Sequence, residues 1–385
     1  MRRKVNIVLS YVLVAVVAAG VTLIGTLLAM RPQNEFRELE DILGRYYIGD
    51  IDLQARKDAM SKAMVAALGD KWSYYMTAEE YESYEESVSN SYVGVGITVQ
   101  NAADKQGIEI VAVTAGGPAE AAGILPEDRI VVIDGTSVLD WDVGSIGNLI
   151  KGQEGTPVKL GILRAGEHLE FNVVRQRFRT PVATLKMLED GMALMTIENF
   201  DSRCAQETIA AVEQAQAQGA TALIFDVRNN PGGYKDEMVK ILDYLLPEGD
   251  LFRSVDYLGR SAVERSDASC VDMPMAVLMN LNSYSAAEFF AAALQEYDAA
   301  ITVGEQTYGK GRFQSVIKLS DGSAVNLSIG EYFTPKGKSL AGVGLTPMVP
   351  VQVDDLTAAL IAYDRLEPAE DPQIQAAIQA LKQGN

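Results

Sequence analysis

The order of apolar and polar residues changes character along the chain. Residues 5–30 carry no charge and follow the basic cluster Arg2-Arg3-Lys4. From residue 33 to residue 90, apolar residues recur among charged ones at helical spacing, as in Phe36, Leu39 and Ile42. This pattern predicts an apolar N-terminal segment, followed by a helical segment over residues 33–90.

The apolar segment is long enough to cross a bilayer, which takes about 20 helical residues. Basic residues before such a segment favour a cytoplasmic N-terminus. We therefore expect residues 1–32 to form a cytoplasmic stub and an uncleaved signal-anchor transmembrane helix. The remaining chain would then be extracytoplasmic at the cell membrane. A cleaved signal peptide is the alternative, but the apolar sequence continues from the small residues Ala18-Ala19-Gly20 to Met30.

Beyond residue 91 the sequence becomes rich in short alternating strands broken by glycine and aspartate. Two short helical patterns, at residues 119–122 and 143–150, lie among these strands. A compact β-rich domain with two helices is expected over residues 91–176. The strands are expected at residues 93–99, 108–113, 129–133, 158–163 and 169–174.

Longer elements follow, in which strands and helices alternate. Residues 222–227 and 275–279 are continuous apolar runs typical of buried strands, and residues 204–218 and 286–295 have helical patterns. Shorter strands are expected at residues 194–197 and 324–329. This predicts a mixed α/β domain over residues 177–365. The tail 366–385 places Ile374, Ile378 and Leu381 on one helical face, so we expect a C-terminal helix that docks on the preceding domain.

Composition excludes several function classes. The net charge of −19 opposes binding to nucleic acid. His168 is the single histidine, so no multi-histidine metal site can be built from this chain, and a Ser-His-Asp triad would depend on this one residue. Cys204 and Cys270 are too far apart in sequence for a CxxC motif, and the sequence leaves open whether they pair. We expect no metal and no cofactor.

Two short motifs resemble known sites without their context. Gly304 to Lys310 fits most of a phosphate-binding loop, but Gly311 stands where a magnesium-binding hydroxyl is required. Ser315 and Lys318 have SxxK spacing in a strand-like stretch, where the two side chains point to opposite faces. Neither motif predicts a site, and His168 is interpreted as a surface residue.

Three segments that each follow a predicted buried strand carry the candidate chemistry. The turn of residues 228–233 ends in two glycines and presents unobstructed backbone N–H groups. Residues 280–288 place serines at a helix start, a position that suits either a helix cap or a nucleophile. Residues 309–314 place a lysine between two glycines. Each segment alone has an ordinary structural interpretation.

Taken in order, these segments resemble the C-terminal processing peptidases, which are tail-specific serine proteases of family S41 with a Ser-Lys dyad and a PDZ domain. Residues 68–75 resemble the family's helical lead-in, residues 92–97 its PDZ entry, and residues 226–233 its glycine turn. The nucleophile segment 283–288 departs from the family at Tyr284, usually alanine, and at Ala287, usually serine. The lysine segment 307–314 has Tyr308 in place of phenylalanine. Residues 344–348 end in Pro347-Met348, where the family commonly has a Pro-Asp pair.

The resemblance implies the architecture: an α+β and α/β multidomain chain with a transmembrane helix, a helical lead-in, a PDZ domain and a mixed α/β Ser-Lys protease domain. It also implies roles for individual residues. Ser285 would be the nucleophile, Lys310 the general base and Gln314 the residue that orients the lysine amine. Oxyanion-hole N–H groups would come from Gly232 or Gly233 and from Ala286. The PDZ carboxylate-binding loop would comprise Val93, Gly94, Val95, Gly96 and Ile97.

A lysine can act as a base near neutral pH only if burial lowers its pKa from about 10.4. The implied partners are protein or peptide substrates with accessible C-terminal tails, and a homodimer through the helical lead-in stays open. Two other functions are weighed: a membrane-anchored PDZ scaffold with an inactive hydrolase-like domain, and a different hydrolase such as an amidase. The presence of Ser285, Lys310 and Gln314 together argues against the scaffold.

Overall fold

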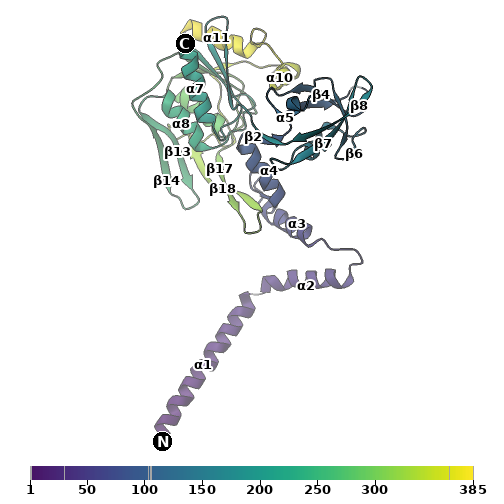
Figure 1. Ribbon diagram of the computed structural model, residues 1–385. Coiled ribbons are helices and arrows are strands. Elements are labelled where there is room, and N and C mark those ends of the chain that lie inside the picture. The colour runs from purple at the N-terminus through teal and green to yellow at the C-terminus, as the bar shows by residue number, and fades with distance from the viewer. Residues whose placement is uncertain (1, 30, 103, 105, 364, 385) are drawn as a thin grey trace. The chain divides into compact units, whose positions relative to one another are not determined.

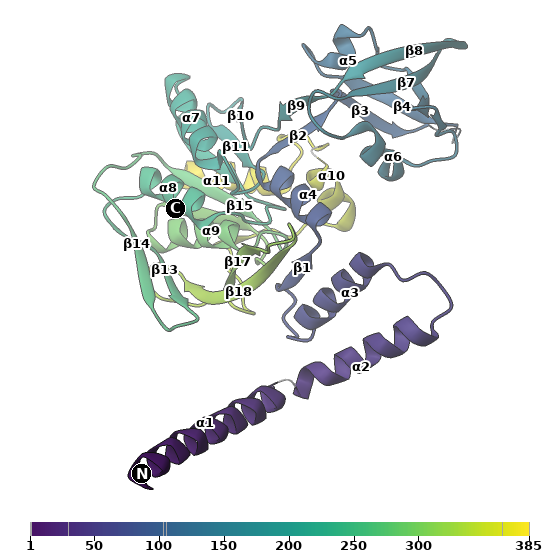
Figure 2. The same cartoon turned by 60° about the horizontal axis from the view of Figure 1, so that its bottom comes forward.

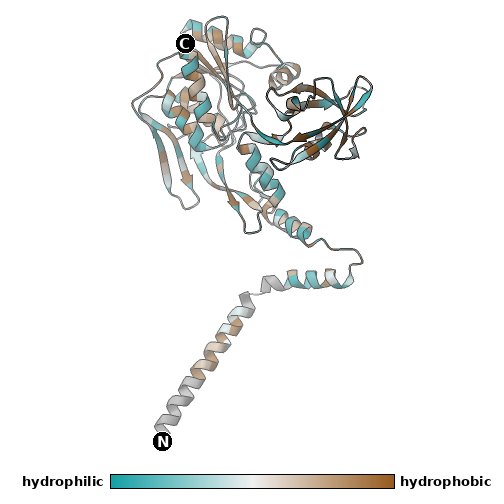
Figure 3. Cartoon of the chain, in the orientation of Figure 1, coloured by the Kyte–Doolittle hydropathy of each residue, from teal (hydrophilic) through white to brown (hydrophobic). Residues whose placement is uncertain are grey.

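The computed structural model describes residues 2–29, 31–102, 104, 106–363 and 365–384 (Figure 1). The chain divides into two compact units, Met1–Leu68 and Gly69–Asn385. The first unit contains the helices α1 (Arg2–Ala29), α2 (Arg31–Tyr46) and α3 (Leu53–Ala66). Figure 3 shows α2 as a largely hydrophilic helix. Arg56 on α3 forms an ion pair with Glu40 on α2 at 3.0 Å.

The expected transmembrane helix receives no support from this structure. Within the described parts of the chain, no helix has both the length and the apolar character that crossing a membrane requires. Met1 and Met30, near the two ends of the expected segment, lie outside the described residues.

The second unit begins with a strand, which the helical pattern of residues 33–90 did not predict. Strand β1 (Tyr74–Met76) pairs antiparallel with β18 (Ala324–Phe333), and Figure 2 shows the two side by side. Helix α4 (Ala78–Val88) follows and starts with a capping box between Thr77 and Glu80. The segment just before the β-rich domain therefore adds a strand to the sheet that contains β18.

The β-rich domain has strands at the expected positions around two helices, but the strand expected over residues 93–99 is divided between β2 and β3. Its sheet has the strand order β3-β4-β5-β7-β8, with β6 paired to β5, while β2 pairs with β9 in a separate ribbon. Alternate residues of these strands, such as Ile110, Ile130 and Leu160, are buried in its core. The elements are β2 (Ser91–Gly94), β3 (Ile97–Asn101), β4 (Ile108–Val113), α5 (Pro118–Ala121), β5 (Arg129–Ile133), β6 (Thr136–Ser137), α6 (Val143–Ile150), β7 (Pro157–Arg164), β8 (Glu167–Val174) and β9 (Gln176–Arg179).

The α/β domain is built on a six-stranded sheet with the order β10-β11-β12-β15-β16-β19. All neighbouring pairs are parallel except β10 with β11. The strands are β10 (Ala183–Met187), β11 (Ala193–Ile197), β12 (Leu223–Asp226), β15 (Met275–Met279), β16 (Ala300–Gly304) and β19 (Val349–Pro350). Every residue of β12, β15 and β16 is buried, because helices cover both faces of the sheet.

One face of this sheet packs against α7 (Cys204–Ala217), α8 (Lys235–Leu245) and α9 (Ala286–Glu296), as Figures 1 and 2 show. The other face packs against α11 (Pro372–Gln383), whose Ile374 and Ile378 are buried. A second sheet contains β13 (Gly249–Asp256), β14 (Ser261–Ser266) and β17 (Arg312–Lys318) together with β1 and β18. A short helix, α10 (Asp355–Ala362), precedes α11.

Candidate active site

The three candidate segments meet at one edge of the six-stranded sheet. Residues 228–233 follow β12, residues 280–285 follow β15, and residues 305–311 follow β16. These strands are parallel neighbours, so their carboxyl ends lie together, which is where α/β sheets place their functional sites. Segments that are far apart in sequence therefore contribute to a common site.

Ser285 lies at the start of α9 in a strained backbone conformation, with φ 59° and ψ −127°. Its Oγ is 2.8 Å from the hydroxyl oxygen of Tyr332 on β18. Its backbone N–H donates a hydrogen bond to the Glu288 carboxylate at 3.0 Å. The hydroxyl is thus held at a helix N-terminus, where the aligned peptide dipoles favour negative charge.

The glycine turn lies directly against the serine. A Cβ added to Gly232 would be 2.6 Å from the Ser285 Cβ and 2.9 Å from the Ala286 nitrogen, so only glycine fits there. The Gly232 N–H already donates to the Asn230 side chain at 2.8 Å. Among the described residues, the N–H groups of Gly233 and Ala286 have no hydrogen-bond partner. Of the expected oxyanion-hole donors, these two are the ones available.

Glu288 joins the serine segment to the lysine segment. One carboxylate oxygen accepts hydrogen bonds from the Thr307 hydroxyl and the Gly309 N–H, both at 2.6 Å. The other accepts from the N–H groups of Ser285 and Lys310. Burial raises the pKa of this carboxyl, and the four hydrogen bonds oppose that rise. The sequence indicated only a helix start at residues 280–288 and not this connection between the two segments.

Lys310 is largely buried, and burial lowers the pKa of its amine to about 8, against the opposing effect of Glu288 and Asp70. The amine nitrogen lies 4.3 Å from the ring centroid of Trp72 and 5.8 Å from that of Tyr284. Within the described structure, no hydrogen bond joins Lys310 Nζ to Ser285 Oγ. The two groups share the site, but each contacts an aromatic side chain.

Among the described residues, no hydrogen bond joins the Gln314 side chain to Lys310. It lies on β17, and its amide nitrogen donates to the Arg312 carbonyl and to the Ser328 hydroxyl, each at 3.1 Å. The expected orientation of the lysine amine by Gln314 is therefore absent in this arrangement. The β17–β18 pairing, not the lysine, sets the position of this side chain.

Tyr332 is the site residue that the sequence did not indicate. Its side chain is only 5% exposed and packs against Phe289, with ring centroids 4.5 Å apart, and against Phe313. Burial raises the pKa of its hydroxyl, so the group stays protonated over the working pH range. Tyr332 and Ser285 are close because Tyr332, on β18, packs against Phe289 on α9. These two elements are distant in sequence, so no local motif indicates the contact.

The expected PDZ loop connects β2 to β3. The Val95 carbonyl accepts a hydrogen bond from Ala119, and the Gly96 carbonyl accepts one from Thr114. Gly96 has φ 79°, and a Cβ there would be 2.9 Å from the Phe178 ring. Strand β3, which begins at Ile97, pairs with β4 alone among the described strands, so its other edge is open beside α6. This geometry suits addition of a peptide strand.

The other sequence candidates lie apart from these segments. His168 is exposed on β8. Cys204 is buried, Cys270 is exposed, and both are free thiols.

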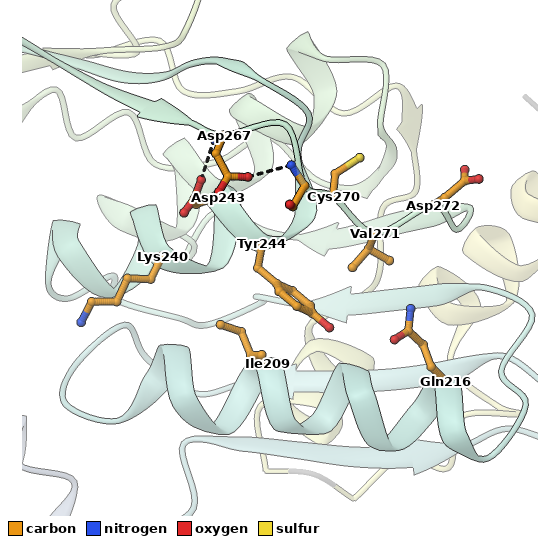
Figure 4. A pocket seen from close by; sticks show the side chains of 10 residues that line it. Ile209, Gln216, Lys240, Asp243, Tyr244, Asp267, Cys270, Val271 and Asp272 are labelled. Carbon is orange, nitrogen blue, oxygen red and sulfur yellow. Dashed lines mark hydrogen bonds between the residues drawn. The ribbon is translucent and has the colours of Figure 1, made fainter.

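A pocket of about 450 Å³ lies between α7, α8 and the segment before β15 (Figure 4). It contains none of the expected site residues; its lining includes Gln216, Tyr244 and Cys270.

Known proteins share these features. The model of peptidase family S41 matches residues 191–351, and a PDZ-domain model matches residues 109–164. The carboxy-terminal processing protease CtpA of Bacillus subtilis is 31% identical over 371 residues, covering 92% of this chain and 79% of that protein. The carboxyl-terminal-processing protease of Synechocystis is 31% identical over 330 residues, covering 83% of this chain and 76% of that protein.

A solved structure of a Bacteroides fragilis protein assigned to the S41 proteases aligns with a TM-score of 0.54. The alignment covers 88% of this chain and 93% of that one at 17% identity, which supports the fold alone. The match to the Bacillus subtilis protein, by contrast, extends over 92% of this chain, and the range matched by the S41 model includes positions 285, 310 and 314. The chain therefore belongs to peptidase family S41, as a carboxy-terminal processing serine protease that carries a PDZ domain.

Proposed function

We propose that the protein cleaves polypeptides near their C-terminal tails by acyl transfer, with Ser285 as nucleophile and Lys310 as general base. One observation carries this proposal: a strained serine at a helix N-terminus shares a sheet edge with a partly buried lysine whose pKa is lowered to about 8. A lysine with this pKa is partly neutral near neutral pH and can accept a proton.

In the first step, the Lys310 amine takes the Ser285 hydroxyl proton while Oγ attacks the substrate carbonyl carbon. The amine must first leave the Trp72 ring and come within about 3 Å of Oγ. The N–H groups of Gly233 and Ala286 are the proposed donors to the oxyanion. The protonated lysine then gives its proton to the leaving amine, and water releases the acyl group from Ser285. In this mechanism Gln314 would turn toward the lysine as it moves.

The PDZ domain is proposed to bind the substrate's C-terminal carboxylate at the loop of residues 93–97, while the tail pairs with the open edge of β3. This binding would select tails and control access to Ser285. Comparing a peptide that has a free C-terminus with its amidated form tests the idea. Equal cleavage of the two forms would argue against carboxylate recognition.

Cellular location and assembly are separate proposals that rest on sequence. The basic N-terminus and uncharged run favour a single-pass membrane protein with an extracytoplasmic catalytic domain. Carbonate extraction of membranes and protease accessibility in intact cells would test this, and release into the soluble fraction would count against it. A homodimer through the helical lead-in, residues 33–90, is tested by sedimentation of the full chain in detergent.

The decisive experiment uses the full chain in detergent and an unstructured protein with an apolar C-terminal tail. Ser285→Ala and Lys310→Ala are assayed beside the parent, and mass spectrometry identifies the fragments. Cleavage by the parent alone supports the proposal. Tail binding without cleavage by the parent would instead favour a binding scaffold, and cleavage by Ser285→Ala would show that another nucleophile acts.

A further inference from the structure

Three aromatic side chains form a cluster beside the two candidate catalytic groups. The ring centroids of Trp72, Tyr284 and Tyr308 are 5.6–6.0 Å apart in every pair. None of the three is buried, and Tyr308 is 39% exposed. We call this cluster the aromatic wall. Aromatic rings left accessible at a site commonly serve as contact surfaces for a ligand.

The aromatic wall lies on the lysine side of the nucleophile. Tyr284 directly precedes Ser285, while the Lys310 amine rests 4.3 Å from the Trp72 centroid and 5.8 Å from the Tyr284 centroid. In acyl transfer by a serine, the general base also returns its proton to the leaving amine, so it lies on the leaving-group side of the scissile bond. The aromatic wall therefore borders the position of the residue that supplies this amine.

Movement of the Lys310 amine toward Ser285 would uncover the ring face of Trp72. Lys310 now occupies that face, but as a base it must lie within hydrogen-bond distance of Ser285 Oγ. Its departure leaves an aromatic surface next to the scissile bond. A large apolar substrate side chain could cover this surface and lose contact with water, which a small side chain could not do to the same extent.

The charge beside the aromatic wall is positive. The exposed ammonium of Lys71 lies 4.6 Å from the Tyr308 centroid and 5.0 Å from the Trp72 centroid, and it donates a hydrogen bond to the Tyr308 hydroxyl. Glu288 and Asp70 are the carboxylates that act on Lys310, and both are engaged in hydrogen bonds. A basic substrate side chain would meet the ammonium group of Lys71 here.

We propose that Trp72, Tyr284 and Tyr308 form the subsite for the residue immediately after the scissile bond, which selects large apolar side chains, and that Lys71 disfavours basic ones. This inference rests on the proposed function, since it takes Ser285 and Lys310 as the reacting pair. It adds a specificity that the catalytic residues alone do not determine.

The test uses four peptides that the parent cleaves at one mapped bond and that differ only after that bond: phenylalanine, alanine, glutamate or lysine. The parent is expected to prefer phenylalanine to alanine by about tenfold in kcat/KM, and glutamate to lysine by about fivefold. Tyr284→Ala should reduce the first ratio to below about threefold. The matched control Tyr257→Ala, a 72% exposed tyrosine at a hairpin turn, should leave it unchanged.

Two further variants separate the effect of the aromatic rings from the effect of the Lys71 charge. Lys71→Glu should reverse the preference for glutamate over lysine. Tyr308→Phe keeps the ring but removes the hydroxyl that holds Lys71, so it should retain the apolar preference and weaken the acidic one. Lys71 is exposed, so its replacement tests the charge even if removing a ring unfolds the protein.

The subsite would be overturned if the parent had nearly the same kcat/KM for the phenylalanine and alanine peptides. It would also be overturned if folded Tyr284→Ala kept the parent's ratio of these two kcat/KM values. An unchanged glutamate-to-lysine ratio in Lys71→Glu would overturn the role of the charge. Failure of the proposed function has a different signature: no peptide is cleaved by the parent, or Ser285→Ala cleaves as the parent does, and the inference then falls with it.

Discussion

The hydroxyl oxygens of Ser285 and Tyr332 are 2.8 Å apart, although the two residues come from different sheet systems. The phenol ring is fixed by Phe289 and Phe313, and the Tyr332 backbone N–H donates to the carbonyl of Gly311, next to Lys310. Tyr332 therefore contacts both catalytic segments. Its hydroxyl is suited to hold the Ser285 side chain in one rotamer before the Lys310 amine comes within hydrogen-bond distance of Oγ.

Tyr332→Phe should lower kcat about three- to tenfold and leave KM nearly unchanged, because it removes one hydrogen bond to the nucleophile without altering the packing of the ring. Steady-state kinetics with a tail peptide measures both constants. Tyr297→Phe is the control, since that hydroxyl donates to the Asp250 carbonyl away from Ser285. A rise in KM at constant kcat would indicate a substrate contact instead.

Activity should depend on the protonation of Lys310. The amine must be neutral to accept the serine proton, and its pKa is lowered to about 8. Below this pH the neutral fraction falls about tenfold per pH unit, so kcat/KM should rise with pH through about 8 and then level off. A pH profile of the parent shows this directly. A profile flat from pH 6 to pH 9 would argue against lysine as the base, and Lys310→Arg should be inactive at every pH.

Replacing the Glu288 carboxylate should damage both stability and catalysis. The amide of Glu288→Gln can accept only on its oxygen, which leaves N–H donors from the serine or lysine segment facing an NH₂ group. We expect a loss of about 3 kcal/mol in unfolding free energy and at least about a tenfold loss in kcat/KM. Thermal melting and peptide assays measure the two effects.

The control for Glu288→Gln is Glu120→Gln, an exposed carboxylate that accepts one backbone N–H from Gly116. Its effect on stability should stay within about 0.5 kcal/mol. If Glu288→Gln had the same melting temperature and the same kcat/KM as this control, the buried carboxylate would not be what holds the two segments together.

The sequence predicted the elements whose patterns are local and strong. Strands β12 and β15 are continuous apolar runs buried on both faces, and α9 is an alanine-rich helix, so each was expected within a residue or two of its bounds. Strand β1 was missed because three residues between helical stretches carry no periodicity. Its partner, Ala324–Asn326, is distant in sequence, and the register depends on the assembled fold.

The candidate site also contains residues that a local motif indicates and contacts that only the assembled fold produces. Ser285, Lys310 and the glycine turn could be picked from motifs that follow buried strands. Glu288 has the spacing of a helix cap, but its bonds to Thr307 and Gly309 exist only because β16 lies beside β15. Gln314 matches its motif, yet its hydrogen bonds are set by the β17–β18 pairing. Motif spacing thus identifies residues but not the conformation that they adopt.

Arg228 connects the glycine turn to the C-terminal helix through two buried ion pairs. Arg228 is 4% exposed and lies between the carboxylates of Asp226 on β12 and Asp371 at the cap of α11, with a further hydrogen bond to Gln373. Arg228→Met would leave two buried carboxylates without their cation, at an expected cost of about 3–5 kcal/mol. Hydrogen exchange of the α11 amides should accelerate, and activity should fall because the turn that holds Gly232 against Ser285 loosens.

The control Arg260→Met breaks an exposed pair with Asp256 and should cost less than about 1 kcal/mol. If exchange of α11 in Arg228→Met matched that of Arg260→Met, the buried ion pairs would not be what fastens the C-terminal helix to the active-site edge of the sheet.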